Sequence, residues 1–222
     1  MKNHTDIINW AANYLMDSID SEVVVETPWS NVIRLTCSKG VFYLKQPAPT
    51  IAQEAKILQL LKANVPSVLA TNEDLHCFLL QDAGLNLRNY LKTNLQPDLL
   101  CRATQQFITM QRSVENHLHA FLSLGVLDWG LDKLPNLYDT LINQNVFLKN
   151  EGMSDKEIQV LHKTSRKIKQ EFALLAEYKV PETIVQPDFN TNNVLIDPIS
   201  KKLTHIIFII ISVNFRRFHM LI

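Results

Sequence analysis

The sequence lacks an excess of charge of either sign, because 22 Lys and Arg residues balance 22 Asp and Glu residues. A neutral chain offers no broad electrostatic attraction to nucleic acid or to an anionic membrane. The composition is otherwise ordinary for a soluble globular protein, with 46% hydrophobic and 20% charged residues. At 222 residues, the chain is long enough to bury a substantial core in one domain or in two small lobes.

Cysteine is scarce, and Cys37, Cys77 and Cys101 are widely spaced and form no C-x-x-C pattern. An odd set of this kind suits a reducing compartment, and we expect buried apolar thiols. His117 and His119 are two residues apart, a spacing that does not share a helix face. This spacing argues against a metal site at that pair.

The sequence also lacks a clear targeting or membrane-spanning segment. Its N-terminal stretch is interrupted by Asp6 and has no apolar signal core. The apolar run from Ile206 to Val213 is too short to cross a bilayer. We therefore expect a cytoplasmic protein without a membrane span, and nothing in the sequence bears on its oligomeric state.

The first third of the chain has the patterns of a small antiparallel lobe. Apolar residues at helical spacing predict a leading helix from Asp6 to Met16. Ser38 to Gly40 has the composition of a three-residue hairpin connection. Five strand-like segments are expected, at Val23–Val25, Val32–Cys37, Val41–Lys45, Val68–Leu69 and Cys77–Gln81.

A helix between the third and fourth of these segments carries an unusual carboxylate. Thr50 and Gln53 are spaced as a capping box at its start. Glu54 then falls on the apolar stripe, where an unpaired charge is costly. Lys45 is the nearest cation along the chain, and we expect it to pair with Glu54. The alternative is that Lys45 reaches solvent and Glu54 lies at the edge of the stripe.

Beyond Gly84 the pattern becomes helical, and we expect the apolar stripes to be core faces. Leu134 to Leu148 predicts one helix with Leu137, Leu141 and Leu148 in the core. A capping box of Ser154 and Glu157 begins another helix, which continues to Tyr178. The first stripe comprises Leu99, Ala103, Phe107, Met110, Val114, Leu118 and Phe121.

A polar loop between two short apolar segments, Ile184–Val185 and Val194–Ile196, carries Asp188 and, five residues later, Asn193. In phosphoryl transfer one carboxylate orients the attacking hydroxyl, and a nearby amide oxygen holds Mg²⁺ against the phosphates. The D-x-x-x-x-N spacing fits those two roles. An Asx-turn loop between strands is the structural alternative.

With Lys45, Glu54 and a strand-to-helix change near Asp82, this loop resembles that of the aminoglycoside phosphotransferase and choline kinase-like family. The family loop usually reads H-G-D-x-x-x-x-N, and here Gln186 and Pro187 replace its His and Gly. The resemblance implies an α+β, kinase-like two-lobed fold. Its expected parts are an antiparallel-sheet N-lobe with one key helix (1–82), a mainly helical C-lobe (83–207) and an aberrant apolar tail (208–222).

The resemblance also implies roles for site residues. Lys45 would bind nucleotide phosphate, with Glu54 orienting it, while Asp188 would position the acceptor hydroxyl and Asn193 would hold Mg²⁺. The expected cofactors are ATP and Mg²⁺. The acceptor would be a hydroxyl of a small polar molecule, a class that includes aminoglycosides, choline, sugars and amino sugars.

Two further segments are assigned through the resemblance. The loop from Thr27 to Asn31, including Ser30, would cover the phosphates, although it has no glycine. The segment at Gln81 and Asp82 would be the hinge between lobes, where backbone groups meet the adenine.

The tail departs from the family. Phe208 stands where the family strand delivers a metal-binding Asp, and no Asp or Glu follows Asp197. We expect a truncated or frameshifted family member, a divergent terminus being the alternative. The functional alternatives are an impaired phosphotransferase, a catalytically dead pseudokinase that at most binds nucleotide, and an interaction protein that uses the apolar tail.

Overall fold

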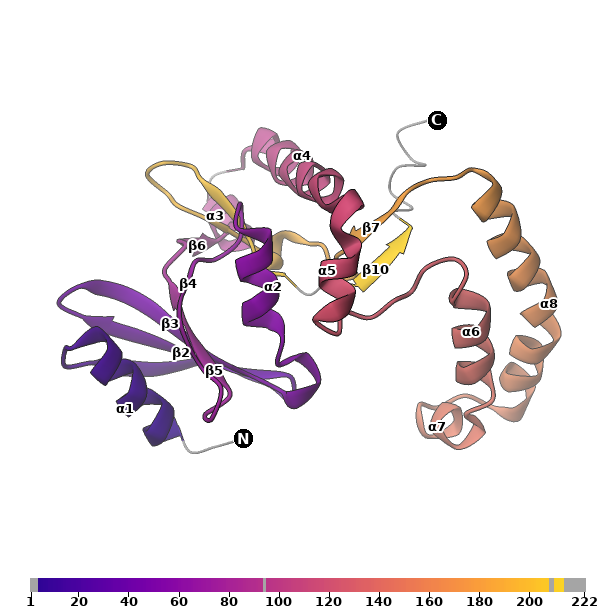
Figure 1. The fold of residues 1–222 in the computed structure, drawn as a ribbon, viewed down its shortest axis with the longest axis horizontal. Coiled ribbons are helices and arrows are strands. Elements are labelled where there is room, and N and C mark those ends of the chain that lie inside the picture. Colours follow the sequence, from indigo (N-terminus) through magenta and orange to yellow (C-terminus); the bar gives the residue numbers. More distant parts are fainter. Residues whose placement is uncertain (1–3, 94, 208–209, 214–222) are drawn as a thin grey trace. The chain divides into compact units, whose positions relative to one another are not determined.

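The computed structural model describes residues 4–93, 95–207 and 210–213. The chain forms two compact units (Figure 1). The first consists of residues 1–110 and 188–208, and the second of residues 111–187 and 209–222. Residue 82, the predicted boundary between lobes, therefore lies inside the first unit. The α+β class predicted from the sequence is confirmed, with an antiparallel sheet near the N-terminus and helices after it.

The first unit is built on a five-stranded antiparallel sheet, as predicted. Its strand order is β1-β2-β3-β5-β4. Cys37 pairs with Gly40, so the β2–β3 connection is the two residues Ser38 and Lys39 rather than the predicted three. The strands are β1 (Asp20–Glu26), β2 (Ser30–Cys37), β3 (Gly40–Pro47), β4 (Val68–Asn72) and β5 (Cys77–Gln81).

Helix α1 (His4–Leu15) covers one face of this sheet. Its buried residues Ile7, Ala11 and Leu15 recur at helical spacing, which is why this stretch folds as an amphipathic helix. They form one core with alternate residues of the strands, because successive strand side chains point to opposite faces. The strand members of that core are Ile33, Leu35, Leu44, Cys77 and Leu79.

Helix α2 (Glu54–Leu61) follows a 3₁₀ turn at Pro49–Ile51 and begins later than predicted. The predicted helix start at Thr50 is wrong, because Gln53 is the N-cap of α2. The predicted hydrogen bond of the Thr50 side chain lies outside the described residues. Glu54 therefore occupies the first turn of α2, where a carboxylate is favoured by the helix dipole.

A three-stranded sheet completes the first unit, in the order β6-β8-β9. Leu85–Asn86 (β6) directly precedes helix α3 (Leu87–Thr93), and helix α4 (Pro97–Val114) follows. Val194–Ile196 (β8) and Leu203–His205 (β9) come from the distant end of the chain. Their shared core contains Leu87, Leu99, Ala103, Val194, Ile196 and Leu203.

The second unit is mainly helical. The predicted helix from Leu134 to Leu148 is wrong, because two helices, α6 (Leu134–Ile142) and α7 (Asn145–Asn150), occupy it. Leu148 is buried as predicted, but Leu137 and Leu141 are 39% and 45% exposed, so they are not core residues. Other elements are η2 (Glu115–His117), α5 (Leu118–Ser123), α8 (Asp155–Glu177), β7 (Glu182–Val185) and β10 (Ile210–Val213).

Helix α8 begins as predicted, because Ser154 and Glu157 form a complete capping box. Ser154 Oγ accepts a hydrogen bond from the Glu157 amide, and Glu157 Oε2 accepts one from the Ser154 amide at 2.7 Å. Two orphan amides of the helix start are thereby satisfied.

The structure describes only part of the C-terminal segment for which an aberrant tail was predicted. Phe208, the expected position of a missing metal ligand, lies outside the described residues, as do 214–222. Strand β10 pairs antiparallel with β7, Ile211 lying opposite Ile184. None of the helices in the described ranges is both long and apolar enough to cross a bilayer. Of the three cysteines, Cys77 is buried and Cys101 is exposed, so the expectation of buried thiols is wrong for Cys101.

Candidate functional site

Lys45 and Glu54 form the ion pair expected from the sequence. Lys45 Nζ donates to Glu54 Oε1 at 2.6 Å, with the two side chains 15% and 10% exposed. Lys45 lies opposite Val32 and Phe78 on neighbouring strands, on the face that does not hold the α1 core. The pair fixes an ammonium group at the surface of the sheet with two of its three N–H donors still available for an anion.

Asp188 and Asn193 form a second pair, across a short loop. Asn193 Nδ2 donates to Asp188 Oδ2 at 2.9 Å and to the Asp188 carbonyl at 2.8 Å. Asn190 Nδ2 donates to the other carboxylate oxygen at 2.6 Å. Because its nitrogen serves Asp188, Asn193 keeps its amide oxygen for a cation, which is the type of ligand that Mg²⁺ takes.

The loop owes its shape to asparagine. Asn190 is the N-cap of the 3₁₀ turn η3 (Thr191–Asn193), and its Oδ1 accepts from the Asn192 amide at 2.8 Å. Asn86 Nδ2, on β6, donates to the Asn192 carbonyl at 2.6 Å. The Asx-turn reading of this loop is therefore correct as local structure, and it coexists with the Asp188–Asn193 pair.

Backbone contacts connect the loop, and the strands β8 and β9 that follow it, to the rest of the first unit. The Ile206 amide donates to the Asn193 carbonyl at 2.9 Å, and the His205 amide to the Asn64 carbonyl, just after α2, at 2.7 Å. Gly84 has φ +101°, and a Cβ there would lie 2.2 Å from the Ile196 carbonyl oxygen. Only glycine allows this approach of two backbones.

An aromatic cluster beside the loop was not expected from the sequence. Phe107 of α4 stacks on Phe189 with ring centroids 4.8 Å apart. His205 of β9 lies 5.9 Å from Phe189 and 5.8 Å from Phe107. The available signal was weak: a single histidine in the apolar run from Leu203 to Ile207.

Ser30 and Asn31, both predicted to belong to the phosphate loop, lie in different surroundings. The Thr27 hydroxyl oxygen accepts from the Ser30 amide at 3.1 Å, which closes the turn between β1 and β2. Asn31 lies on the opposite face of β2 from Val32, the residue that pairs with Lys45. Its side chain is 1% exposed and its Nδ2 lies 3.2 Å from His4 Nε2, so it is not grouped with Lys45.

At the predicted hinge, Gln81 and Asp82 are exposed. The Gln81 amide donates to the Ser67 carbonyl at 3.0 Å, so that N–H is occupied within the sheet. Asp82 Oδ1 accepts from the Gly84 amide at 3.0 Å. Burial, and then the negative charge of Asp82, raise the pKa of Tyr43, which is two residues before Lys45 on the same face of β3.

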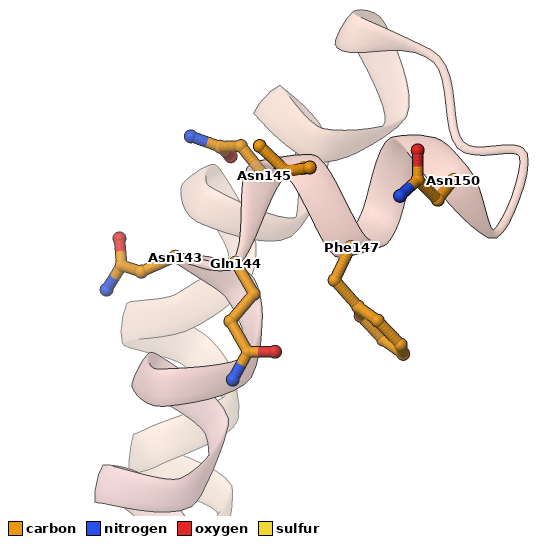
Figure 2. Close-up of a pocket in the computed structure, with 6 residues that line it drawn as sticks. Asn143, Gln144, Asn145, Phe147 and Asn150 are labelled. Carbon is orange, nitrogen blue, oxygen red and sulfur yellow. The ribbon is translucent and has the colours of Figure 1, made fainter.

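A cavity of about 630 Å³ lies in the second unit, where α6 meets α7. Figure 2 shows that the amide groups of Asn143, Asn145 and Asn150 point in different directions and that the Phe147 ring projects outward. None of the residues predicted for the site lines it, and its amides do not converge on one point.

Comparisons with known protein structures identify the fold. No protein-family model matches the chain, and no curated protein matches it. A macrolide 2'-phosphotransferase type I structure superposes with a TM-score of 0.58 at 12% identity, covering 94% of this chain and 72% of that one. A thermostable mutant of aminoglycoside phosphotransferase APH(4)-Ia, in its apo form, superposes at 0.54 and 17% identity, covering 90% and 69%. The chain thus has the kinase-like fold of these phosphotransferases.

Proposed function

We propose, from this phosphotransferase-like fold and its paired side chains, that the chain binds ATP with Mg²⁺ for phosphoryl transfer to a small molecule. The observation that carries the proposal is the presence of both pairs, Lys45–Glu54 and Asp188–Asn193, in one unit. Phosphoryl transfer depends mainly on positioned charge, and these pairs supply a fixed cation, a carboxylate and an amide oxygen. That both pairs face one cleft is part of the proposal.

Each side chain has a role that its contacts suit. Glu54 holds Lys45 in place, so little side-chain entropy remains to be lost when Lys45 meets a phosphate oxygen. Asp188 is exposed and is oriented by Asn190 and Asn193, as a group that receives an acceptor hydroxyl must be. Asn193 offers its amide oxygen to Mg²⁺, which would neutralise charge on the phosphates.

The proposal names the chemical class of the acceptor and not an individual molecule. The two structural neighbours are named as macrolide and aminoglycoside phosphotransferases. We propose a hydroxyl of a small polar molecule as acceptor, in a cytoplasmic setting. Asp82 belongs to the nucleotide-binding segment of this proposal, together with Ser30 and Gln81.

A second function, nucleotide binding without useful turnover, is favoured by one sequence observation. Phe208, whose side chain has no oxygen, stands at the position where the resemblance expects the second metal ligand. With Asn193 as a lone metal ligand, Mg²⁺ would be held weakly. The first step, ATP binding, is common to both functions.

Equilibrium binding of ATP with and without Mg²⁺ tests the proposal. Lys45→Met is expected to weaken binding by about 10- to 100-fold, the worth of a charged hydrogen bond. Lys56→Met is the matched control, because Lys56 is also a lysine of this lobe but forms an exposed ion pair with Glu73. Equal affinity of the two variants, or no ATP binding by the wild-type chain, would refute the nucleotide site.

A further inference from the structure

His205 is a fully buried imidazole at the base of the candidate catalytic loop. Its side chain is 1% exposed, and neither ring nitrogen has a hydrogen-bond partner among the described residues. Burial lowers its pKa to about 4, so the ring is neutral near pH 7. A buried polar group without a partner costs roughly 1–3 kcal/mol, so its place in the core has to be explained.

The surroundings of His205 indicate what the ring does there. Phe107 and Phe189 both lie within 6 Å, centroid to centroid, and the three rings form a mutually contacting cluster. Phe189 directly follows Asp188 in the chain. The His205 ring therefore packs against the start of the loop at Phe189.

The backbone of the same strand supports the other end of the loop. His205 pairs with Val194, the residue after Asn193, and the next amide along, that of Ile206, donates to the Asn193 carbonyl. The end of β9 thus meets the loop twice: the His205 ring packs on Phe189, which follows Asp188, and the Ile206 amide bonds to the Asn193 carbonyl. Because Phe189 adjoins Asp188, we expect displacement of the ring to shift Asp188 relative to Asn193 and to weaken their 2.9 Å hydrogen bond.

We propose that His205 is a positioning residue, whose ring, packed against Phe107 and Phe189, holds the Asp188–Asn193 pair in place and so orients the Asn193 amide oxygen that would bind Mg²⁺. This inference rests on the proposed function, because its first test measures ATP binding. It assigns no proton transfer to His205 and requires only the shape of the ring. Phenylalanine should therefore replace histidine, whereas alanine should not.

The test measures the Mg²⁺-dependent part of ATP affinity, as the ratio of the dissociation constants without and with Mg²⁺. In His205→Ala this ratio is expected to fall by about 10-fold or more, as when a group supporting a metal ligand is removed. His205→Phe is expected to keep the wild-type ratio. Leu15→Ala, a cavity variant in the separate α1 core, is the matched control for lost stability and should also keep it.

Hydrogen exchange gives a second measurement that does not need ATP. In His205→Ala, amides from Phe189 to Val194 should exchange faster relative to those of the five-stranded sheet, a change absent from Leu15→Ala. If His205→Ala does not fold, Phe107→Leu, which removes the stacked ring at smaller cost, is expected to give both effects. Unchanged exchange and an unchanged Mg²⁺ ratio would overturn the positioning role. Absence of ATP binding with the expected exchange result would overturn the proposed function alone.

Discussion

The Lys45 ammonium lies 2.6 Å from the Glu54 carboxylate, and both side chains are largely withdrawn from water. At such a site each charge depends on the other, because removing one leaves its partner desolvated and uncompensated. Exposed pairs such as Lys56–Glu73 behave differently, since water screens them and they contribute at most about 1 kcal/mol. Mutation can distinguish buried from exposed ion pairs by the change in the free energy of unfolding.

Lys45→Met is predicted to lower the free energy of unfolding by about 3 kcal/mol, because Glu54 is left buried without a cation. The double variant Lys45→Met/Glu54→Leu should recover most of that loss, since an apolar pair can replace a buried ion pair. Urea unfolding of the single and double variants measures both effects. Recovery of stability without recovery of ATP binding would separate the structural role of the pair from its role in binding.

Gly84→Ala is predicted to be strongly destabilising for two reasons. A positive φ costs an L-residue roughly 1–2 kcal/mol, and here the new Cβ would also meet the Ile196 carbonyl at 2.2 Å. Gly152→Ala is the control, because Gly152 has φ +94° but no atom within 4 Å of its Cβ position. Thermal unfolding of both variants isolates the steric contribution, and equal losses would show that the backbone approach at Gly84 relaxes freely.

Stability should depend on pH through His205. Its folded pKa, about 4, lies below the ordinary value of 6.5, so the unfolded chain binds more protons between those values. Stability is therefore full above about pH 6.5 and falls as the pH drops towards 4, by up to about 3 kcal/mol. His205→Phe should lack this component. The measurement is the difference in unfolding free energy between wild type and His205→Phe at several pH values from 4 to 7, and a constant difference would contradict the prediction.

The pKa values of Asp197, Asp139 and Glu157 are also lowered in the folded chain, so these groups lose stability at acid pH as well and could mask the effect in the wild type alone. Hydrogen bonds from the Ser200 and Ile199 amides lower the pKa of Asp197, and a hydrogen bond from Lys169 lowers that of Asp139. Hydrogen bonds from Ser154 lower the pKa of Glu157. These contributions occur equally in His205→Phe and cancel in the difference, which is why the comparison uses two proteins.

The five-stranded sheet, α1 and the start of α8 could be predicted from the sequence because each rests on a local signal. Alternation of apolar residues marks the strands, and the Ser154–Glu157 capping box marks a helix start. The Lys45–Glu54 pair could also be predicted, since a carboxylate on an apolar stripe needs a nearby cation.

The remaining features depend on contacts between distant parts of the chain. Gly84 approaches Ile196, and His205 packs on Phe107, only because β6, β8 and β9 form one sheet. No local pattern contains that pairing. The start of α2 was misplaced for a related reason: Thr50 and Gln53 match a capping box by spacing, but the chain forms a 3₁₀ turn before Glu54.

Turnover is predicted to be slow even if ATP binds. Two protein ligands normally hold the metal that neutralises the β- and γ-phosphates, and Phe208 stands at the position expected for the second of them, after Asn193. Loss of one positioned electrostatic group commonly costs about 10²- to 10³-fold in rate. We therefore expect ATP consumption with aminoglycoside, choline and sugar acceptors to lie that far below the roughly 1–100 per second of typical kinases. Asp188→Ala is the control for background hydrolysis, and acceptor-dependent turnover at ordinary kinase rates, abolished by that substitution, would show the second metal ligand to be dispensable.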